Sequence, residues 1–193
     1  PFHNIEIARA YREWSDKIKD NPTDKESKLA LSLAEYQKLL ILTPKNPTPL
    51  KEMGNIYFSK QDYSQAIEYY LKVVALDNQQ TDIYYLIGKS YKQSGDIAKT
   101  IETYEKAFRL GNNQIGISLG EEYFNQNRFE DCLKVNLELI RLEPKDYRHY
   151  HNASVVLEQL GRIDEAIEHS QKALGLVPPT QQQGVRGFLQ KLE

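Results

Sequence analysis

The sequence repeats itself with a period close to 34 residues, and this feature restricts the fold more than any other. Small residues mark the repeat at intervals of 34, 32 and 34 residues: Gly54, Gly88, Gly120 and Ser154. A period of this length is typical of arrays in which each repeat is one small unit that packs on its neighbours. The 193 residues therefore predict an array of similar units rather than one spherical core.

Each repeat contains two amphipathic segments. In the first repeat, Leu50, Met53 and Tyr57 recur at spacings of three and four, which places them on one face of a helix. A short polar break follows, and a second apolar series begins at Tyr63. The same order recurs three times, with breaks at Gln61-Asp62, Ser94-Gly95-Asp96, Asn127-Arg128 and Gly161-Arg162. We therefore expect each repeat to be a pair of helices joined by a short turn.

Small residues recur on both helices of each predicted pair. The first helices carry the residues that mark the period, and the second helices carry Ala66, Thr100, Cys132 and Ala166. A bulky side chain at a close crossing would push two helices apart. We therefore expect the two series of small residues to face each other.

This pattern resembles the tetratricopeptide repeat family. The resemblance covers four units, at residues 47–80, 81–112, 113–146 and 147–180. It implies an all-α, right-handed superhelical solenoid of antiparallel helix pairs. The proline that commonly ends the second helix is replaced by Asn78 and Asn112 in the first two units. In the second unit, which is two residues short, we expect Gly111 to end the helix as a C-cap.

The two ends of the chain predict further helices. Residues 1–46 are interpreted as a degenerate N-terminal pair, with helices at 5–19 and 25–44 and a longer loop around 21–24. Ser32 falls in the small-residue position of that pair. Residues 181–193 predict a C-terminal capping helix, because apolar residues recur there at helical spacing.

Charge and hydropathy exclude several classes of protein. A net charge of −2 lacks the basic excess of proteins that bind bulk nucleic acid. No apolar run approaches the ~20 residues that span a bilayer. The chain begins at Pro1 without a methionine, so we expect it to start inside a longer protein and leave an upstream anchor open. We expect a soluble domain, cytoplasmic or periplasmic, that binds no nucleic acid.

The sequence contains no recognisable catalytic, cofactor or metal motif. The four histidines are not clustered with carboxylates, and we expect them on the surface: His3, His149, His151 and His169. Cys132 is the only cysteine and falls at a small-residue position, where a buried thiol behaves as a small apolar group. We therefore predict a protein that is not an enzyme, with no cofactor and no metal.

The family resemblance implies a concave surface, lined by the first helices, that holds a peptide or helix of a partner. Its predicted residues are Lys51, Asn55, Phe58, Tyr85, Lys89, Ile117, Glu121, Phe124, Arg148, His151 and Asn152. The same face also carries Ser59, Asp82, Leu86, Lys92, Gln114, Ser118, Asn125, Val155 and Glu158. Phe58, Tyr85 and Phe124 are the predicted anchors, because aromatic residues dominate interface energies. Aromatic residues are also common at two of these positions in the family, so they need not mark a ligand.

One family function can be tested residue by residue. The co-chaperone branch holds a chaperone's C-terminal carboxylate with five Lys, Asn and Arg residues. Lys51 and Asn55 match the first two, but Leu86, Gln114 and Ser118 stand at the others. A carboxylate clamp needs convergent positive charge. The sequence therefore argues against a chaperone-tail adaptor.

The functional hypothesis is a protein–protein interaction scaffold with an unidentified protein or peptide partner. Two alternatives stay open. The chain could be the docking or regulatory region of a longer enzyme or membrane-anchored protein. It could also be a self-assembling scaffold, in which terminal helices dock into a neighbouring copy.

Overall fold

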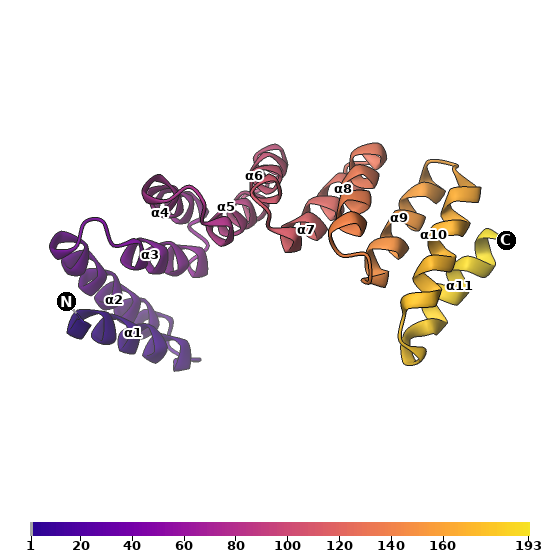
Figure 1. Cartoon of the computed structure of the whole chain (residues 1–193). Coiled ribbons are helices and arrows are strands. Elements are labelled where there is room, and N and C mark those ends of the chain that lie inside the picture. The colour runs from indigo at the N-terminus through magenta and orange to yellow at the C-terminus, as the bar shows by residue number, and fades with distance from the viewer. Residues whose placement is uncertain (1) are drawn as a thin grey trace. The chain divides into compact units, whose positions relative to one another are not determined.

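The computed structural model describes residues 2–193, which form helices joined by short connections and include no β-strand (Figure 1). The predicted all-α class is confirmed. The helices are α1 (Phe2–Lys17), α2 (Pro22–Leu42), α3 (Pro47–Ser59), α4 (Tyr63–Leu76), α5 (Thr81–Gln93), α6 (Ile97–Arg109), α7 (Asn113–Asn125), α8 (Phe129–Leu142), α9 (Tyr147–Gln159), α10 (Ile163–Leu176) and α11 (Gln182–Leu192), with a 3-10 turn at Pro179–Gln181 before α11.

The turns between the two helices of each repeat share one backbone conformation. A residue with positive φ stands after the first helix of each pair: Gln61 (62°), Gly95 (84°), Asn127 (55°) and Gly161 (71°). The left-handed conformation ends a helix and redirects the chain. Gly111, with φ of 92°, follows the end of α6 in the same way, as the sequence predicted. The exact residue limits of the four repeats stay a prediction.

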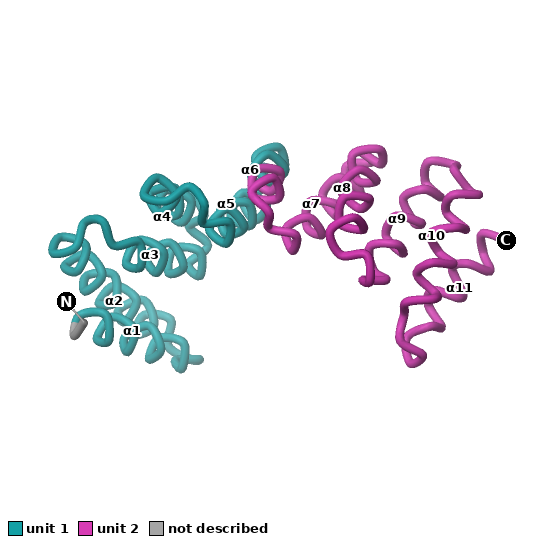
Figure 2. Tube along the Cα trace, in the orientation of Figure 1, with its two compact units in different colours: residues 1–103 teal, residues 104–193 magenta. Residues whose placement is uncertain are grey.

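The chain divides into two compact units, residues 1–103 and residues 104–193 (Figure 2). In the first unit, α2 packs on α1 and α3, and α4 packs on α3 and α5. In the second unit, α7 to α11 pack in chain order, each on the next. The boundary lies within α6.

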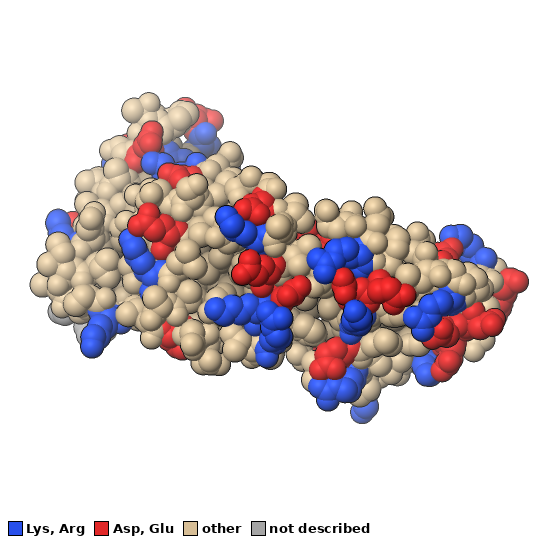
Figure 3. All heavy atoms as spheres, turned by 90° about the horizontal axis from the view of Figure 1, so that it is seen from above, with Lys and Arg blue, Asp and Glu red and all other residues tan. Residues whose placement is uncertain are grey.

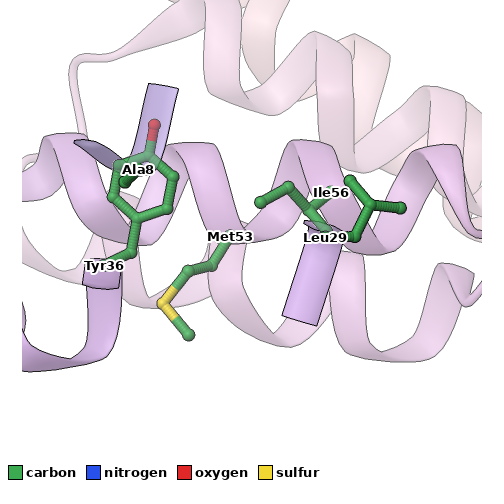
Figure 4. Packing of buried hydrophobic residues seen from close by; sticks show 5 residues of the cluster. All are labelled: Ala8, Leu29, Tyr36, Met53 and Ile56. Carbon is green, nitrogen blue, oxygen red and sulfur yellow. The ribbon is translucent and has the colours of Figure 1, made fainter. Parts of the chain in front are cut away.

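The first unit joins its N-terminal pair to α3 through an apolar cluster (Figure 4). Ala8 from α1 meets residues of α2 and α3 there, namely Leu29, Tyr36, Met53 and Ile56. The Ser32 hydroxyl donates to the Ala8 carbonyl oxygen at 2.7 Å, so a small residue does mark the crossing of α1 and α2. Residues 2–46 therefore pack as part of the first unit.

The predicted longer loop around residues 21–24 is wrong. Helix α2 begins at Pro22, and the Asn21 side chain accepts a hydrogen bond from the Asp24 backbone N–H at 3.1 Å. Proline suits the first position of a helix because its missing N–H would have no partner there. The Asn-Pro sequence is thus a helix start.

The second unit ends with α11 packed on α10. Ala173 and Val177 form an apolar cluster with Val185 of α11, and Tyr147 and Tyr150 of α9 pack against it. The predicted C-terminal helix therefore exists and covers apolar side chains of the helix before it. That it acts as a stabilising cap stays a prediction.

Two surface properties bear on function. On the face shown in Figure 3, basic and acidic side chains are interspersed rather than separated into fields of one sign. None of the helices within residues 2–193 is both long and apolar enough to cross a membrane.

Candidate functional site

The second unit contains a pocket that brings several predicted groove residues together. Its volume is about 390 Å³, and it lies among α7, α8 and α9. Four of the eleven predicted groove residues line it, together with two of the other residues on the same predicted face: Ile117, Glu121, Phe124 and Asn152, with Asn125 and Val155. The sequence therefore located these residues on one surface.

The walls of the pocket are apolar. Ile117 and Phe124 come from α7, and Val155 and Val156 come from α9. The Phe124 ring packs edge-on against Phe129 of α8, with ring centroids 5.4 Å apart. This contact holds the aromatic wall in place before any ligand arrives.

The floor of the pocket has one polar side chain, that of Asn136, and its residues were not among those predicted for the groove. It consists of Gly120, Cys132 and Asn136. Asn136 is only 4% exposed, and its Nδ2 donates to the Cys132 carbonyl oxygen at 2.9 Å. Its Oδ1 accepts no hydrogen bond from any part of the chain that the structure describes. Asn136 lines the pocket, and its carbonyl oxygen has no donor within residues 2–193.

The Cys132 thiol in the floor is held in its neutral form by burial. Burial raises the pKa of Cys132 to about 11, and the hydrogen bond from Asn136 offsets part of that rise. The thiol is therefore neutral at pH 7, and the thiolate is the form that reacts. The pocket offers contacts for binding rather than a nucleophile.

The rim of the pocket carries three polar side chains that are available to a ligand. Glu121 and Asn125 are exposed, and Asn152 is half-buried. Within residues 2–193, none of the three side chains has a hydrogen-bond or ion-pair partner. The rim therefore combines one negative charge with two carboxamides.

The first unit treats the equivalent residues differently. Phe58 packs edge-on against Tyr63 at 5.5 Å, as Phe124 packs on Phe129. The Tyr70 hydroxyl donates to Asn55 Oδ1 at 2.8 Å, and Lys89 Nζ lies 5.2 Å from the centroid of the Phe58 ring. These predicted groove residues are therefore engaged by their own chain.

Two further predicted residues lie in the first unit. Lys51 pairs with Asp82, with 2.7 Å between Nζ and the carboxylate. Tyr85 is 38% exposed on α5. The assignment of the first-unit residues to a binding groove stays a prediction.

The predicted facing of the small residues holds in the third repeat and is wrong in the first. The Cys132 thiol donates to the Gly120 carbonyl oxygen at 3.2 Å, as the sequence predicted. A Cβ at Gly54 would lie 2.5 Å from the ring of Tyr70, so the partner of Gly54 is Tyr70 and not Ala66. A Cβ at Gly120 would meet only Asn136 Nδ2 at 3.6 Å and Cys132 Sγ at 3.9 Å, which are ordinary contacts. Glycine is thus required by the chain's own packing at 54 and not at 120.

Two predicted groove residues of the second unit do not line the pocket. The Arg148 guanidinium pairs with Asp146, with Nε 2.9 Å from Oδ1. The His151 ring packs edge-on against Phe188 of α11 at 5.5 Å, and burial lowers its pKa. Helix α11 therefore contacts a side chain that the sequence assigned to the groove.

The expectation that the histidines lie on the surface is wrong for His149, which is fully buried. Its Nε2 lies 3.1 Å from Glu143 Oε2, and the hydrogen bond from His149 lowers the pKa of that carboxyl. Asn113 Nδ2 donates to the other oxygen of Glu143 at 2.9 Å. His149 of α9 and Asn113 of α7 are thus linked through Glu143, which follows the last residue of α8. The side chain of His3 lies outside the described part of the chain.

The same region holds the one group of possible metal ligands found among the described residues. Ligand atoms of Glu143, Asp146 and His149 lie within 4.8 Å of one another. Arg148, Asn113 and His149 already donate hydrogen bonds to the two carboxylates. The absence of a metal site stays a prediction.

These observations define a class of protein built from stacked helix pairs, with a pocket between neighbouring pairs. Sequence models described as TPR repeat and tetratricopeptide repeat match residues 54–95, 81–113 and 117–179. The chain belongs to the tetratricopeptide repeat family.

Curated relatives match at low identity. The TPR repeat-containing protein MJ1428 of Methanocaldococcus jannaschii is 25% identical over an alignment of 162 positions that covers 76% of this chain and 28% of that protein. The Hsp70-Hsp90 organizing protein of Triticum aestivum is 24% identical over an alignment of 140 positions that covers 70% of this chain and 23% of that protein. The chain spans about a quarter of the length of these two relatives.

Solved structures confirm the tetratricopeptide solenoid fold. A crystal structure of MamA has a TM-score of 0.63 at 23% identity, covering 88% of this chain and 91% of that one. YrrB, described as a TPR protein with an unusual peptide-binding site, has a TM-score of 0.63 at 19% identity, covering 98% and 95%. At these identities the likeness concerns the fold alone.

Proposed function

We propose that this chain is a non-enzymatic protein–protein interaction scaffold, and that residues 104–193 hold a segment of the partner in the pocket among α7, α8 and α9. The observation that carries the proposal is the pocket itself. It combines apolar walls, an acceptor on Asn136 and a rim whose polar groups have no partner within residues 2–193. Concave sites with mostly apolar walls and a few placed polar groups are typical of binding sites.

Similarity to other proteins supports the general part of this proposal. The wheat relative is named for organizing two chaperones, and YrrB is described as having a peptide-binding site. A segment of another protein is the ligand that suits a pocket formed between helix pairs. The partner's identity lies beyond these similarities.

The first unit gives further reason to expect no chaperone-tail clamp. Lys51 and Asn55 are the two residues that match the clamp pattern. Lys51 is paired with Asp82, and Asn55 accepts from Tyr70. Both would have to give up these contacts to bind a carboxylate. The proposal therefore concerns the second unit and a different kind of ligand.

A peptide library tests the function although the partner is unidentified. Random peptides would be selected on the whole chain and then titrated against Phe124→Ala, with Phe58→Ala as the matched control. We expect Phe124→Ala to weaken binding by ~1–3 kcal/mol, the range for an interface anchor. Phe58→Ala should leave it unchanged, because that ring is engaged with Tyr63 and Lys89.

Circular dichroism of each variant serves as the folding control. Equal binding by Phe124→Ala and the unaltered chain would contradict the proposed site. Peptides that lose affinity only for Phe58→Ala would move the site to the first unit. Sedimentation at several concentrations separates partner binding from self-assembly, since a pocket filled by a second copy would give dimers without peptide.

A further inference from the structure

We propose that the pocket receives the side chain of a tyrosine from the partner segment. This inference rests on the proposed function and names the ligand group of the same site. It comes from comparing the pocket with the place in the first unit where the chain supplies such a ring itself. Gly54 corresponds to Gly120 and Tyr70 to Asn136, each pair being 66 positions apart in the sequence.

The first unit shows how a tyrosine occupies this position. The Tyr70 ring lies so close to Gly54 that a Cβ there would come within 2.5 Å of it. Its hydroxyl donates to Asn55 Oδ1 at 2.8 Å. Because residue 54 has no side chain, an aromatic ring can pack directly on the helix there, and the Asn55 Oδ1 atom accepts from its hydroxyl. We call this ring-binding position the ring seat.

The second unit has the glycine of the ring seat, Gly120, but no aromatic ring from its own chain at the position of Tyr70. Asn136 takes the place of the tyrosine, and Gly120 and Asn136 line the pocket. Glycine is less favourable than alanine inside a helix. No side chain in the described part of the second unit comes nearer than 3.6 Å to a Cβ built at Gly120, so the chain's own packing gives no reason for glycine. A ring supplied from outside would give one.

The polar groups of the pocket match a phenol. A tyrosine hydroxyl carries one donor, and the pocket floor offers the Asn136 Oδ1, which has no donor from residues 2–193. Ile117, Phe124 and Val155 provide apolar walls for the ring. Phenylalanine would cover the oxygen and leave it without a partner, which is unfavourable.

Other long side chains fit less well. A lysine ammonium that reached the floor would place a charge and three donors against one neutral acceptor, because the Glu121 carboxylate lies at the rim. A charge buried away from its counterion is costly. A phosphotyrosine would bring a dianion to a rim that carries the Glu121 carboxylate. The pocket therefore favours unmodified tyrosine.

The test uses the peptides selected on the whole chain. We expect a tyrosine at one fixed position in the peptides that depend on Phe124. Changing that residue to phenylalanine should weaken binding about fivefold, as loss of one hydrogen bond does. Phosphorylating it should weaken binding by at least about tenfold. Peptides that depend on Phe124 and contain no tyrosine would overturn this inference while leaving the proposed function standing.

Gly120→Ala tests the ring seat without disturbing the chain. The added methyl group meets only ordinary contacts in the free protein, so the fold should be unaffected. We expect the tyrosine peptides to bind at least about tenfold more weakly, because the methyl group would occupy the ring's place. Gly175→Ala on α10 is the matched control, since a Cβ there meets nothing within 4 Å. Unchanged binding by Gly120→Ala would overturn the inference.

A direct probe covers the case in which no peptide is selected. N-acetyltyrosine amide and N-acetylphenylalanine amide would be titrated into isotope-labelled protein and followed by NMR. We expect the tyrosine amide to shift the resonances of Gly120 and Asn136 at concentrations where the phenylalanine amide does not. Equal shifts by both probes, or shifts confined to other residues, would contradict the phenol site.

Discussion

The first and third repeats are built alike and differ at one decisive position. Both place an aromatic residue of the first helix edge-on against an aromatic residue at the start of the second: Phe58 on Tyr63, and Phe124 on Phe129. Where the first repeat inserts the Tyr70 ring, the third has Asn136. Two equivalent helix pairs therefore differ: α3 and α4 enclose packed core, and α7 and α8 line a pocket.

The difference shows that a binding site can arise by omission. A large side chain fills the space between the helices in the first repeat and satisfies Asn55. The third repeat has Asn136 in place of that ring, and a pocket with apolar walls is open there. The Asn136 Oδ1 atom is an acceptor without a donor from residues 2–193. The residues that form the walls can be found from the repeat pattern. The open space between these walls exists because the third repeat has no tyrosine at the position equivalent to Tyr70.

The largest expected effect comes from emptying the filled position. Tyr70 is 1% exposed, and Tyr70→Ala should lower the free energy of unfolding by ~3–5 kcal/mol, as large-to-small changes of buried aromatic residues do. Asn136→Ala should cost only about 1 kcal/mol, because it removes one hydrogen bond beside an existing pocket. Urea unfolding followed by circular dichroism measures both. Similar losses for the two variants would contradict the claim that only one position is packed.

The next effect comes from moving the ring into the third repeat. Asn136→Tyr should place a tyrosine against Gly120, with Glu121 at the position of Asn55 as its acceptor. We expect the urea midpoint to change little and binding of the selected peptides to fall at least tenfold, about 1.4 kcal/mol, because the chain then fills its own pocket. Isothermal titration gives the affinity. Peptide binding that survives in a folded Asn136→Tyr protein would place the ligand elsewhere.

The smallest of the three effects concerns the thiol in the pocket floor. Because burial raises the pKa of Cys132 to about 11 from 9.0, its alkylation by iodoacetamide should reach half its maximal rate near pH 11. A raised folded-state pKa favours the neutral thiol, so its contribution to stability is present below pH 9 and is lost as the pH rises toward 11.

Asn136→Tyr should slow this alkylation several-fold at a fixed pH, because the ring would block the route through the pocket. The same reagent on urea-unfolded protein gives the rate of an accessible thiol. Half-maximal alkylation of the folded protein at pH 9 would show that Cys132 is not held in the buried setting that the structure gives it.

The sequence predicted the helix pairs from their periodicity, and most of the pocket walls from the resemblance to the tetratricopeptide repeat family. Apolar residues at helical spacing define the buried face of each helix, and the opposite face then follows by register. Ile117, Glu121, Phe124 and Asn152 were assigned to the concave face through that resemblance, and the structure places them around one pocket. Their role in binding stays a prediction.

Other features depend on pairings that one helix does not reveal. Cys132 was predicted to be buried and is, yet the ring that Gly54 accommodates comes from Tyr70, one helical turn beyond the expected Ala66. The burial of His149 was missed because its hydrogen-bond partner, Glu143, lies at the end of the preceding helix, so helical spacing within α9 does not reveal the contact. Asn136, where earlier repeats have tyrosine, was the available signal for the pocket floor.

The most direct test of the account compares one substitution at two equivalent glycines by urea unfolding. Gly54→Ala should lower the free energy of unfolding by ~1–3 kcal/mol, because its methyl group would overlap the Tyr70 ring. Gly120→Ala should leave it unchanged or raise it by up to about 1 kcal/mol, because alanine favours the helix and meets only ordinary contacts. Equal destabilisation by the two substitutions would show that the third repeat is packed like the first and has no open seat for a partner's side chain.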